Sequence, residues 1–173
     1  MTRPHNILLT TPRFRVETVE RTTASGATVR REVVRHPGAV TILPLVDADH
    51  VCLIRNYRMA VARTLIELPA GTLEPGEDPL DTARRELIEE TGYRAARLEL
   101  LHTFFLSPGI LDERMYLFLA SELTAGDAQR EACEEIENLV VPWQQAIEWV
   151  LQQKIQDAKT IVGLLYYDAL LRQ

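Results

Sequence analysis

Apolar and polar residues alternate along the first part of the chain in the manner of β-strands. Phe14, Val16 and Val19 are separated by charged side chains, and a second alternating stretch covers residues 28–35. The intervening Ala24-Ser25-Gly26 is typical of a turn. The pattern therefore predicts an N-terminal hairpin or small sheet. Because an isolated two-stranded hairpin is marginally stable in water, this segment needs its own domain or a partner subunit to pack on.

Short apolar runs separated by turn residues follow, and they predict further strands. Near the C-terminus, Trp143, Ile147, Val150 and Leu151 recur at helical spacing, so we interpret this stripe as a packing surface rather than a base-stacking platform. We expect strands at residues 39–45, 51–54, 65–68, 97–105, 114–121 and 136–141, and helices beginning at about residues 78, 142 and 159.

The best-defined helix lies within residues 71–93, GTLEPGEDPLDTARRELIEETGY. Its start is marked by Asp78, a good N-cap residue, and by Pro79, which suits the first helical position. Gly92 is suited to the position that ends a helix. Leu80, Ala83 and Leu87 lie at helical spacing and predict the buried face. We expect the residues before Asp78, which include two glycines and a proline, to form a loop.

A second face of this helix is acidic. Glu86, Glu89 and Glu90 are spaced i, i+3, i+4, so their carboxylates crowd one side, and Glu77 approaches from the preceding loop. Arg85 can pair with Glu89, but one cation does not balance four anions. A bound hard cation would, and Mg²⁺ prefers oxygen ligands and commonly shares its shell with substrate phosphates. The alternative interpretation is a solvated helix face, which is how most such glutamates are used.

Composition and charge narrow the class of protein. The chain has 173 residues, 46% hydrophobic and 25% charged, as in an ordinary globular domain. Its net charge of −6 argues against a nucleic-acid partner. The absence of a signal-peptide h-region and of a long apolar run argues against a membrane and predicts a cytoplasmic protein. Of the two cysteines, Cys52 is expected in the core, and Cys133 suggests neither a disulfide nor a zinc site.

The run G-x5-E-x7-R-E-L-x-E-E-x-G-Y from Gly71 to Tyr93 resembles the signature of the Nudix hydrolases. Tyr93 is a departure, because the family more often has an aliphatic residue there. Outside this run, residues 36–40 (HPGAV), 54–58 (IRNYR), 107–109 (SPG) and the final VGLLYYDALLR resemble the ADP-ribose pyrophosphatase branch. Pro108 stands fifteen residues after Tyr93, as a proline does in that branch.

The resemblance implies a fold and an assembly. The fold is α+β, an α/β/α sandwich with a mixed sheet and an added N-terminal β segment. Residues 38–173 would form the hydrolase domain, and residues 1–37 would form the added segment. In this branch that segment helps to form a swapped homodimer, which implies a homodimer here.

The resemblance also assigns roles to residues of the acidic helix. Glu86 and Glu90 match the principal Mg²⁺ ligands, with Mn²⁺ as the alternative ion. Glu89 bridges or assists, and the backbone carbonyl of Ala70 completes the site. Arg85 and Glu77 match positions that orient the cluster.

Further roles fall outside the helix. Glu134 aligns with the catalytic base, but the local sequence EACEEIE departs from the family pattern, so Glu135 and Glu137 remain alternatives. The guanidinium groups of Arg55 and Arg58 are suited to clamp a pyrophosphate. By resemblance, Arg58 is a phosphate-binding residue of the substrate site. Pro108 and Gly109 are expected to belong to the same site.

The implied reaction is Mg²⁺-dependent hydrolysis of the diphosphate bond of ADP-ribose, which gives AMP and ribose 5-phosphate. The substrate could instead be another nucleoside diphosphate sugar such as GDP-mannose, because the signature handles only the diphosphate. A third alternative is a binding module that senses ADP-ribose without cleaving it. Such modules usually have a degraded signature and an attached DNA-binding or channel segment, whereas this signature is intact.

Overall fold

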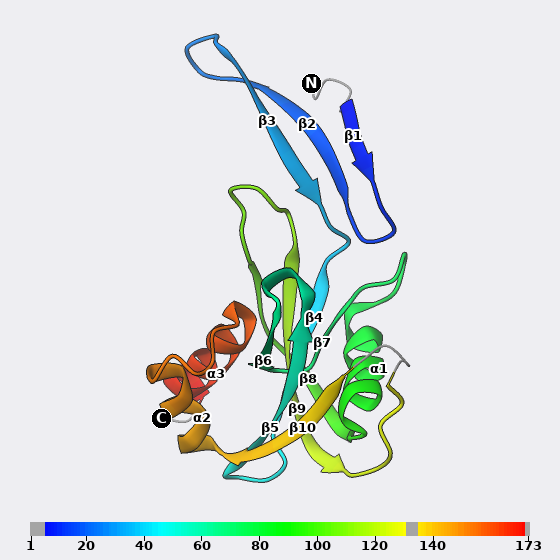
Figure 1. Cartoon of the computed structure of the whole chain (residues 1–173), viewed down its shortest axis with the longest axis vertical. Coiled ribbons are helices and arrows are strands. Elements are labelled where there is room, and N and C mark those ends of the chain that lie inside the picture. Colours follow the sequence, from blue (N-terminus) through cyan, green and yellow to red (C-terminus); the bar gives the residue numbers. More distant parts are fainter. Residues whose placement is uncertain (1–5, 131–134, 172–173) are drawn as a thin grey trace.

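The computed structural model describes residues 6–130 and 135–171, and it confirms the α+β class (Figure 1). None of the helices in these ranges is long and apolar enough to cross a membrane. The elements in chain order are β1 (Asn6–Thr10), β2 (Arg15–Thr22), β3 (Thr28–Arg35), β4 (Ala39–Pro44), β5 (His50–Arg58), the 3₁₀ turn η1 (Met59–Val61), β6 (Arg63–Glu67), β7 (Ala70–Thr72), α1 (Pro79–Thr91), β8 (Arg94–Phe105), β9 (Arg114–Thr124), β10 (Ile136–Pro142), α2 (Trp143–Leu151) and α3 (Ala158–Leu171).

Two sheets make up the central layer of the main body. One is mixed, with the order β7-β4-β9-β8, in which β4 runs parallel to β9. The other has the order β10-β5-β6 and is antiparallel. Helix α1 lies on one side of this layer, and α2 and α3 lie on the other (Figure 1). Strand β4 is buried along its whole length, as expected of a strand covered on both faces.

Each side of the central layer has its own core. Val40, Ile42 and Phe118 pack with Ala83 and Leu87 of α1. The larger core joins the opposite side of the layer to α2 and α3. It includes Leu43, Leu53, Leu68, Leu117, Trp143, Ile155 and Leu164. The two cores fix α1 and α3 relative to the same strands. As a result, the first turn of α3 and the acidic face of α1 both lie near the segment that joins β6 to β7.

Two expectations about this body are corrected. Residues 71 and 72 were expected in a loop, but with Ala70 they form β7, because the backbone of this segment pairs with β4 from Thr41↔Ala70 to Ala39↔Thr72. Leu151 was expected in the apolar stripe of α2, but 74% of its surface is exposed, because it is the last residue of the helix and lies beyond the core. Trp143 is buried as expected, and its indole N–H donates to Asp168 at 2.7 Å.

The N-terminal segment is a three-stranded antiparallel sheet, β1-β2-β3, that projects away from the main body (Figure 1). The predicted hairpin is β2 and β3, and β1 adds a strand that the alternation did not indicate. Ile7, Leu8 and Leu9 of β1 are all exposed, Ile7 by 54%. Ile7 pairs with Glu17 and Leu9 with Val16, and because these consecutive residues of β2 point to opposite faces, both faces of the sheet present apolar side chains to solvent.

The loop between β8 and β9 is tied to the end of β3. The Val34 N–H donates to the Ile110 carbonyl at 2.8 Å, and the Asp112 N–H donates to the Val34 carbonyl at 3.1 Å. The Asp112 carboxylate also accepts from Arg35 at 2.9 Å and from the His36 N–H at 2.8 Å. These bonds hold the projecting sheet and the loop together at the point where the chain enters the main body.

Gly92 and Gly76 offer a matched test of the helix C-terminus. Both have positive φ (79° and 82°), which costs a non-glycine residue about 1–2 kcal/mol. A Cβ at Gly92 would also overlap the Gly126 carbonyl oxygen and lie 2.9 Å from the Ala128 nitrogen, whereas a Cβ at Gly76 meets nothing within 4 Å. We expect Gly92→Ala to lower the free energy of unfolding by about 2 kcal/mol more than Gly76→Ala. Urea denaturation of both variants measures the difference, and equal losses would contradict the predicted backbone overlap.

Candidate active site

Helix α1 forms as its sequence predicts. The Asp78 carboxylate accepts from the Leu80 N–H at 2.8 Å, Pro79 is the first helical residue, and Gly92 ends the helix in the left-handed region. Ala83 and Leu87 are buried against the sheet. Because these residues fix the rotation of the helix, the acidic face turns toward β7 and the loop that precedes α1.

Glu90 and Glu86 lie directly against β7. Glu90 is only 3% exposed, and its carboxylate accepts a hydrogen bond from the Ala70 N–H at 2.9 Å. Glu86 passes so close to Gly71 that a Cβ there would overlap its carboxyl group. Gly71 is therefore required by close approach and not by φ, and the pairing of β7 with β4 holds both contacts in place.

Arg85 is bonded to three of the four carboxylates. Its Nε and Nη2 donate to Glu77 at 3.1 Å each, and its Nη1 donates to Glu86 at 2.7 Å and Glu89 at 2.9 Å. The expected pair with Glu89 is thus one part of a larger clamp. The hydrogen bond from Arg85 lowers the pKa of Glu77 from 4.5 to about 2, and the bond to Glu77 is also the main cause that raises the pKa of Arg85.

The donor set of this face suits a hard divalent cation. Carboxylate oxygens are the ligands that Mg²⁺ and Mn²⁺ accept, and the side chains of Glu86 and Glu89 are partly exposed at 13% and 35%. The lack of a side chain at Gly71 makes room for the Glu86 carboxyl group. Within the described ranges, no three acidic, histidine or cysteine side chains converge closely enough to hold an ion, because Arg85 and the Ala70 N–H occupy the carboxylates.

A cavity of about 500 Å³ adjoins this face. Ala70 and Gly71 form part of its wall, and so does Arg58, which the sequence assigned to phosphate binding. Two residues that sequence reasoning missed, Glu67 and Lys159, also line it. Glu67 occupies a strand position, and its burial was signalled only by the apolar residues around it. Lys159 was noted only as the start of a helix.

The remaining predicted residues are not gathered in this cavity. Arg55 is exposed and pairs with Glu137 across β5 and β10 at 3.0 Å. Pro108 and Gly109 line a separate hollow of about 200 Å³ beside β3. Glu134 lies outside the described residues.

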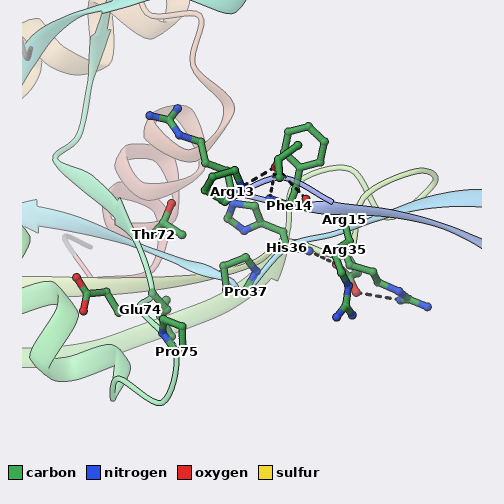
Figure 2. A pocket seen from close by; sticks show the side chains of 13 residues that line it. Arg13, Phe14, Arg15, Arg35, His36, Pro37, Thr72, Glu74 and Pro75 are labelled. Atoms are coloured by element: carbon green, nitrogen blue, oxygen red, sulfur yellow. Dashed lines mark hydrogen bonds and ion pairs between the residues drawn. The ribbon is translucent and has the colours of Figure 1, made fainter. Parts of the chain in front are cut away.

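A further cavity of about 590 Å³ lies between the N-terminal sheet and the loop before α1 (Figure 2). Arg13 and Phe14 line it from the turn before β2, His36 lines it from the entry to β4, and Glu74 lines it from the loop. The sequence indicated Phe14 only as part of a strand pattern. The cavity combines an aromatic ring with guanidinium groups, and its wall includes the loop that carries Glu77 into the acidic cluster.

The Glu77–Arg85 contact predicts a pH-dependent difference in stability. Because the pKa of Glu77 is lower in the folded state, its ionised form contributes stability above pH 4.5, and this stability is lost as the pH falls toward 2. We expect Glu77→Gln, measured in EDTA, to be less stable than the wild type at pH 7, with the difference shrinking from pH 4.5 to pH 3. Urea denaturation at several pH values measures it. Glu74→Gln, an exposed change in the same loop, serves as the control, and a pH-independent gap for Glu77→Gln would contradict the assignment.

Comparisons with known proteins agree with this geometry. An ADP-ribose pyrophosphatase of Bacillus subtilis (strain 168) is 40% identical over 144 residues, which cover 82% of this chain and 78% of the relative. A methanol dehydrogenase activator of Bacillus methanolicus is 36% identical over the same shares. A GDP-mannose pyrophosphatase of Klebsiella pneumoniae is 35% identical over 164 residues, which cover 86% of this chain and 81% of the relative.

A solved structure described as an ADP compounds hydrolase superposes with a TM-score of 0.83 and 25% identity, and the match covers 99% of this chain and 94% of the other. This match confirms the predicted sandwich. The protein-family model described as the NUDIX domain matches residues 35–162. This range includes the acidic helix and the residues that line the cavity beside it. The chain therefore belongs to the NUDIX hydrolase family.

Proposed function

We propose that this enzyme hydrolyses the diphosphate bond of ADP-ribose and releases AMP and ribose 5-phosphate. The observation that carries the proposal is the acidic face of α1, which is held against β7 at the wall of a cavity of about 500 Å³. Relatives named ADP-ribose pyrophosphatase, from B. subtilis and other bacteria, support the choice of substrate. GDP-mannose is the alternative, supported by the K. pneumoniae relative.

Magnesium is the proposed cofactor, with Mn²⁺ as the alternative, and NUDIX hydrolases in general depend on a divalent metal ion. Glu86, Glu89, Glu90 and the Ala70 carbonyl would hold it. When bound, such an ion neutralises phosphate oxygens and acidifies a water molecule. The chain contributes the arrangement: Arg85 holds the carboxylates of Glu86 and Glu89 on one side of α1.

The other steps fall to residues around the cavity. Arg58 would bind a phosphate oxygen of the substrate. A glutamate would accept the proton of the attacking water, whose oxygen forms a new bond to phosphorus while the bridging P–O bond breaks. Glu134 is the proposed base, with Glu135 and Glu137 as alternatives. Glu137 is engaged by Arg55 in this structure and would have to leave that pair.

We also propose that residues 1–37 are a dimer-forming segment and that residues 38–173 are the hydrolase domain. The support is the sheet β1-β2-β3, which projects from the body with apolar side chains open on both faces. Exposed apolar patches of this kind mark protein–protein contacts. A second copy of the chain is the proposed partner.

Replacement of Glu90 tests the metal site. We expect Glu90→Gln to lose more than about 100-fold in kcat/KM for ADP-ribose at saturating Mg²⁺, because a proposed metal ligand becomes neutral. Glu99→Gln, an exposed change on β8, should stay within about twofold of the wild type. Chromatography of the products gives kcat/KM of both variants for ADP-ribose. The same assay with ADP-ribose and GDP-mannose gives the substrate preference of the wild type. Near-normal turnover by Glu90→Gln would rule out this cluster as the metal site.

Charges on β1 test the dimer. The double variant Ile7→Asp/Leu9→Asp places a carboxylate on each face of the strand, because Ile7 pairs with Glu17 and Leu9 with Val16. Burial of an unpaired charge in an interface is costly. We expect it to sediment as a monomer where the wild type sediments as a dimer. Thr10→Asp, exposed at the end of the same strand, is the control. A monomeric wild type at micromolar concentration would refute the proposed assembly.

A further inference from the structure

Glu67 is a carboxylate buried completely in the wall of the cavity, and two cations meet it. Arg58 donates from Nε to Oε1 at 2.8 Å and from Nη2 to Oε2 at 2.5 Å. Lys159 donates from Nζ to Oε2 at 2.5 Å, across 92 residues of sequence. Burial by itself raises the pKa of Glu67, but the hydrogen bond from Arg58 and the charges of Lys159 and Arg58 outweigh it, so the pKa lies below 4.5 and the group is ionised.

The two cations differ in position. The Lys159 side chain is 8% exposed, and its Nζ also lies 3.0 Å from the Asp157 carboxylate. Asp157 in turn accepts from the Thr160 N–H at 3.0 Å and from its hydroxyl at 2.6 Å, which fixes the first turn of α3. Lys159 is therefore a fixed and nearly buried cation. Both cations line the cavity, but the Arg58 side chain is 41% exposed and is the more accessible of the two.

Arg58 has N–H donors that its contact with Glu67 does not use. A guanidinium group has five N–H bonds, and the side-on contact with Glu67 uses one from Nε and one from Nη2. Among the described residues, Nη1 has no hydrogen-bond partner. The pKa of Arg58 is raised, first by the hydrogen bond to Glu67 and also by the charges of Glu67 and Glu90. Arg58 thus lies within electrostatic reach of the acidic face of α1.

A single cation would be a poor arrangement for this carboxylate. If Arg58 alone compensated Glu67, any shift of the guanidinium toward a ligand would leave a buried charge unpaired, which is strongly unfavourable. Lys159 removes this conflict, because it compensates the carboxylate from a nearly buried position that Asp157 also holds. Arg58, the more exposed cation, can then share its charge with an incoming anion.

We propose that Lys159 is a positioning residue for substrate binding: it neutralises buried Glu67 so that Arg58, oriented by the same carboxylate, can bind a phosphate oxygen in the cavity. This inference rests on the proposed function for the identity of the substrate, a nucleoside diphosphate sugar. It assigns Lys159 no contact with the reacting atoms, so its loss should affect binding more than turnover.

The test is Lys159→Met, with two readouts. We expect KM for ADP-ribose to rise about tenfold, which corresponds to about 1.4 kcal/mol of binding free energy, while kcat stays within about threefold. The dissociation constant for inorganic pyrophosphate, measured by titration calorimetry with Mg²⁺, should rise by a similar factor. Lys159→Arg should retain both values within about threefold. Lys154→Met, the same change at an exposed lysine before α3, should alter neither.

A double variant separates positioning from a purely structural role. In Glu67→Gln/Lys159→Met a neutral amide replaces the buried carboxylate, and its oxygen can still accept a hydrogen bond from Arg58 and orient it. We therefore expect KM and the dissociation constant for pyrophosphate to return to within about threefold of the wild type. If Lys159→Met alone does not fold, the double variant still tests the proposal, because the double variant leaves no unpaired charge at residue 67. Unchanged constants in folded Lys159→Met, or constants in the double variant still raised tenfold, would overturn the proposal.

The pyrophosphate measurement also distinguishes the two proposals. If the wild type binds pyrophosphate but does not cleave ADP-ribose, the proposed function fails while the role of Lys159 is still decided by the dissociation constants. If the wild type cleaves ADP-ribose and Lys159→Met behaves like the wild type, the role of Lys159 fails and the proposed function stands.

Discussion

Mutual repulsion among the carboxylates on one side of α1 is the constraint on which the site depends. Two different hydrogen-bond partners offset this repulsion. Arg85 holds three of the carboxylates, and the Ala70 N–H holds the fourth, Glu90. Both partners leave the acidic charge in place at the edge of a cavity instead of releasing it into solvent. This arrangement keeps the face available to a divalent cation, which would compete with Arg85 for the same oxygens.

A second charged network begins only a few residues away along the chain. Glu67 ends β6, and Ala70 begins β7, so the segment between them separates an anionic face from the pair of cations at Glu67. A substrate diphosphate with its metal ion presents both signs of charge. The acidic face suits the metal, and Arg58 suits the phosphate oxygens that the metal leaves uncovered. Arg58 thus lines the cavity together with Ala70 and Gly71, the residues of β7 against which the acidic face is packed.

The N-terminal sheet contributes in another way. Its last strand is bonded to the loop between β8 and β9, with Asp112 as the main acceptor. Its first turn forms one wall of the cavity that contains Phe14 and Arg13, opposite the loop before α1 (Figure 2).

Local patterns in the sequence determined the secondary structure and part of the site. Asp78, Pro79 and Gly92 define the limits of α1, because helix caps depend on residues close in sequence. The spacing of Glu86, Glu89 and Glu90 places them on one face for the same reason. Strand alternation predicted β2 and β3, and short apolar runs predicted most of the central strands. These patterns missed β1 and the short strand β7, and β7 forms by pairing with β4, which is distant in sequence.

Tertiary structure alone decided how these parts meet. No local pattern indicates that the Ala70 N–H, rather than solvent, satisfies Glu90, or that Lys159 reaches Glu67 from the far end of the chain. The same holds for Arg55 and Pro108, which we expected at the substrate site with Arg58 but which do not line the cavity that Arg58 lines. Such contacts depend on how whole elements pack, whereas the sequence reports directly only on interactions within one turn of a helix or along one strand.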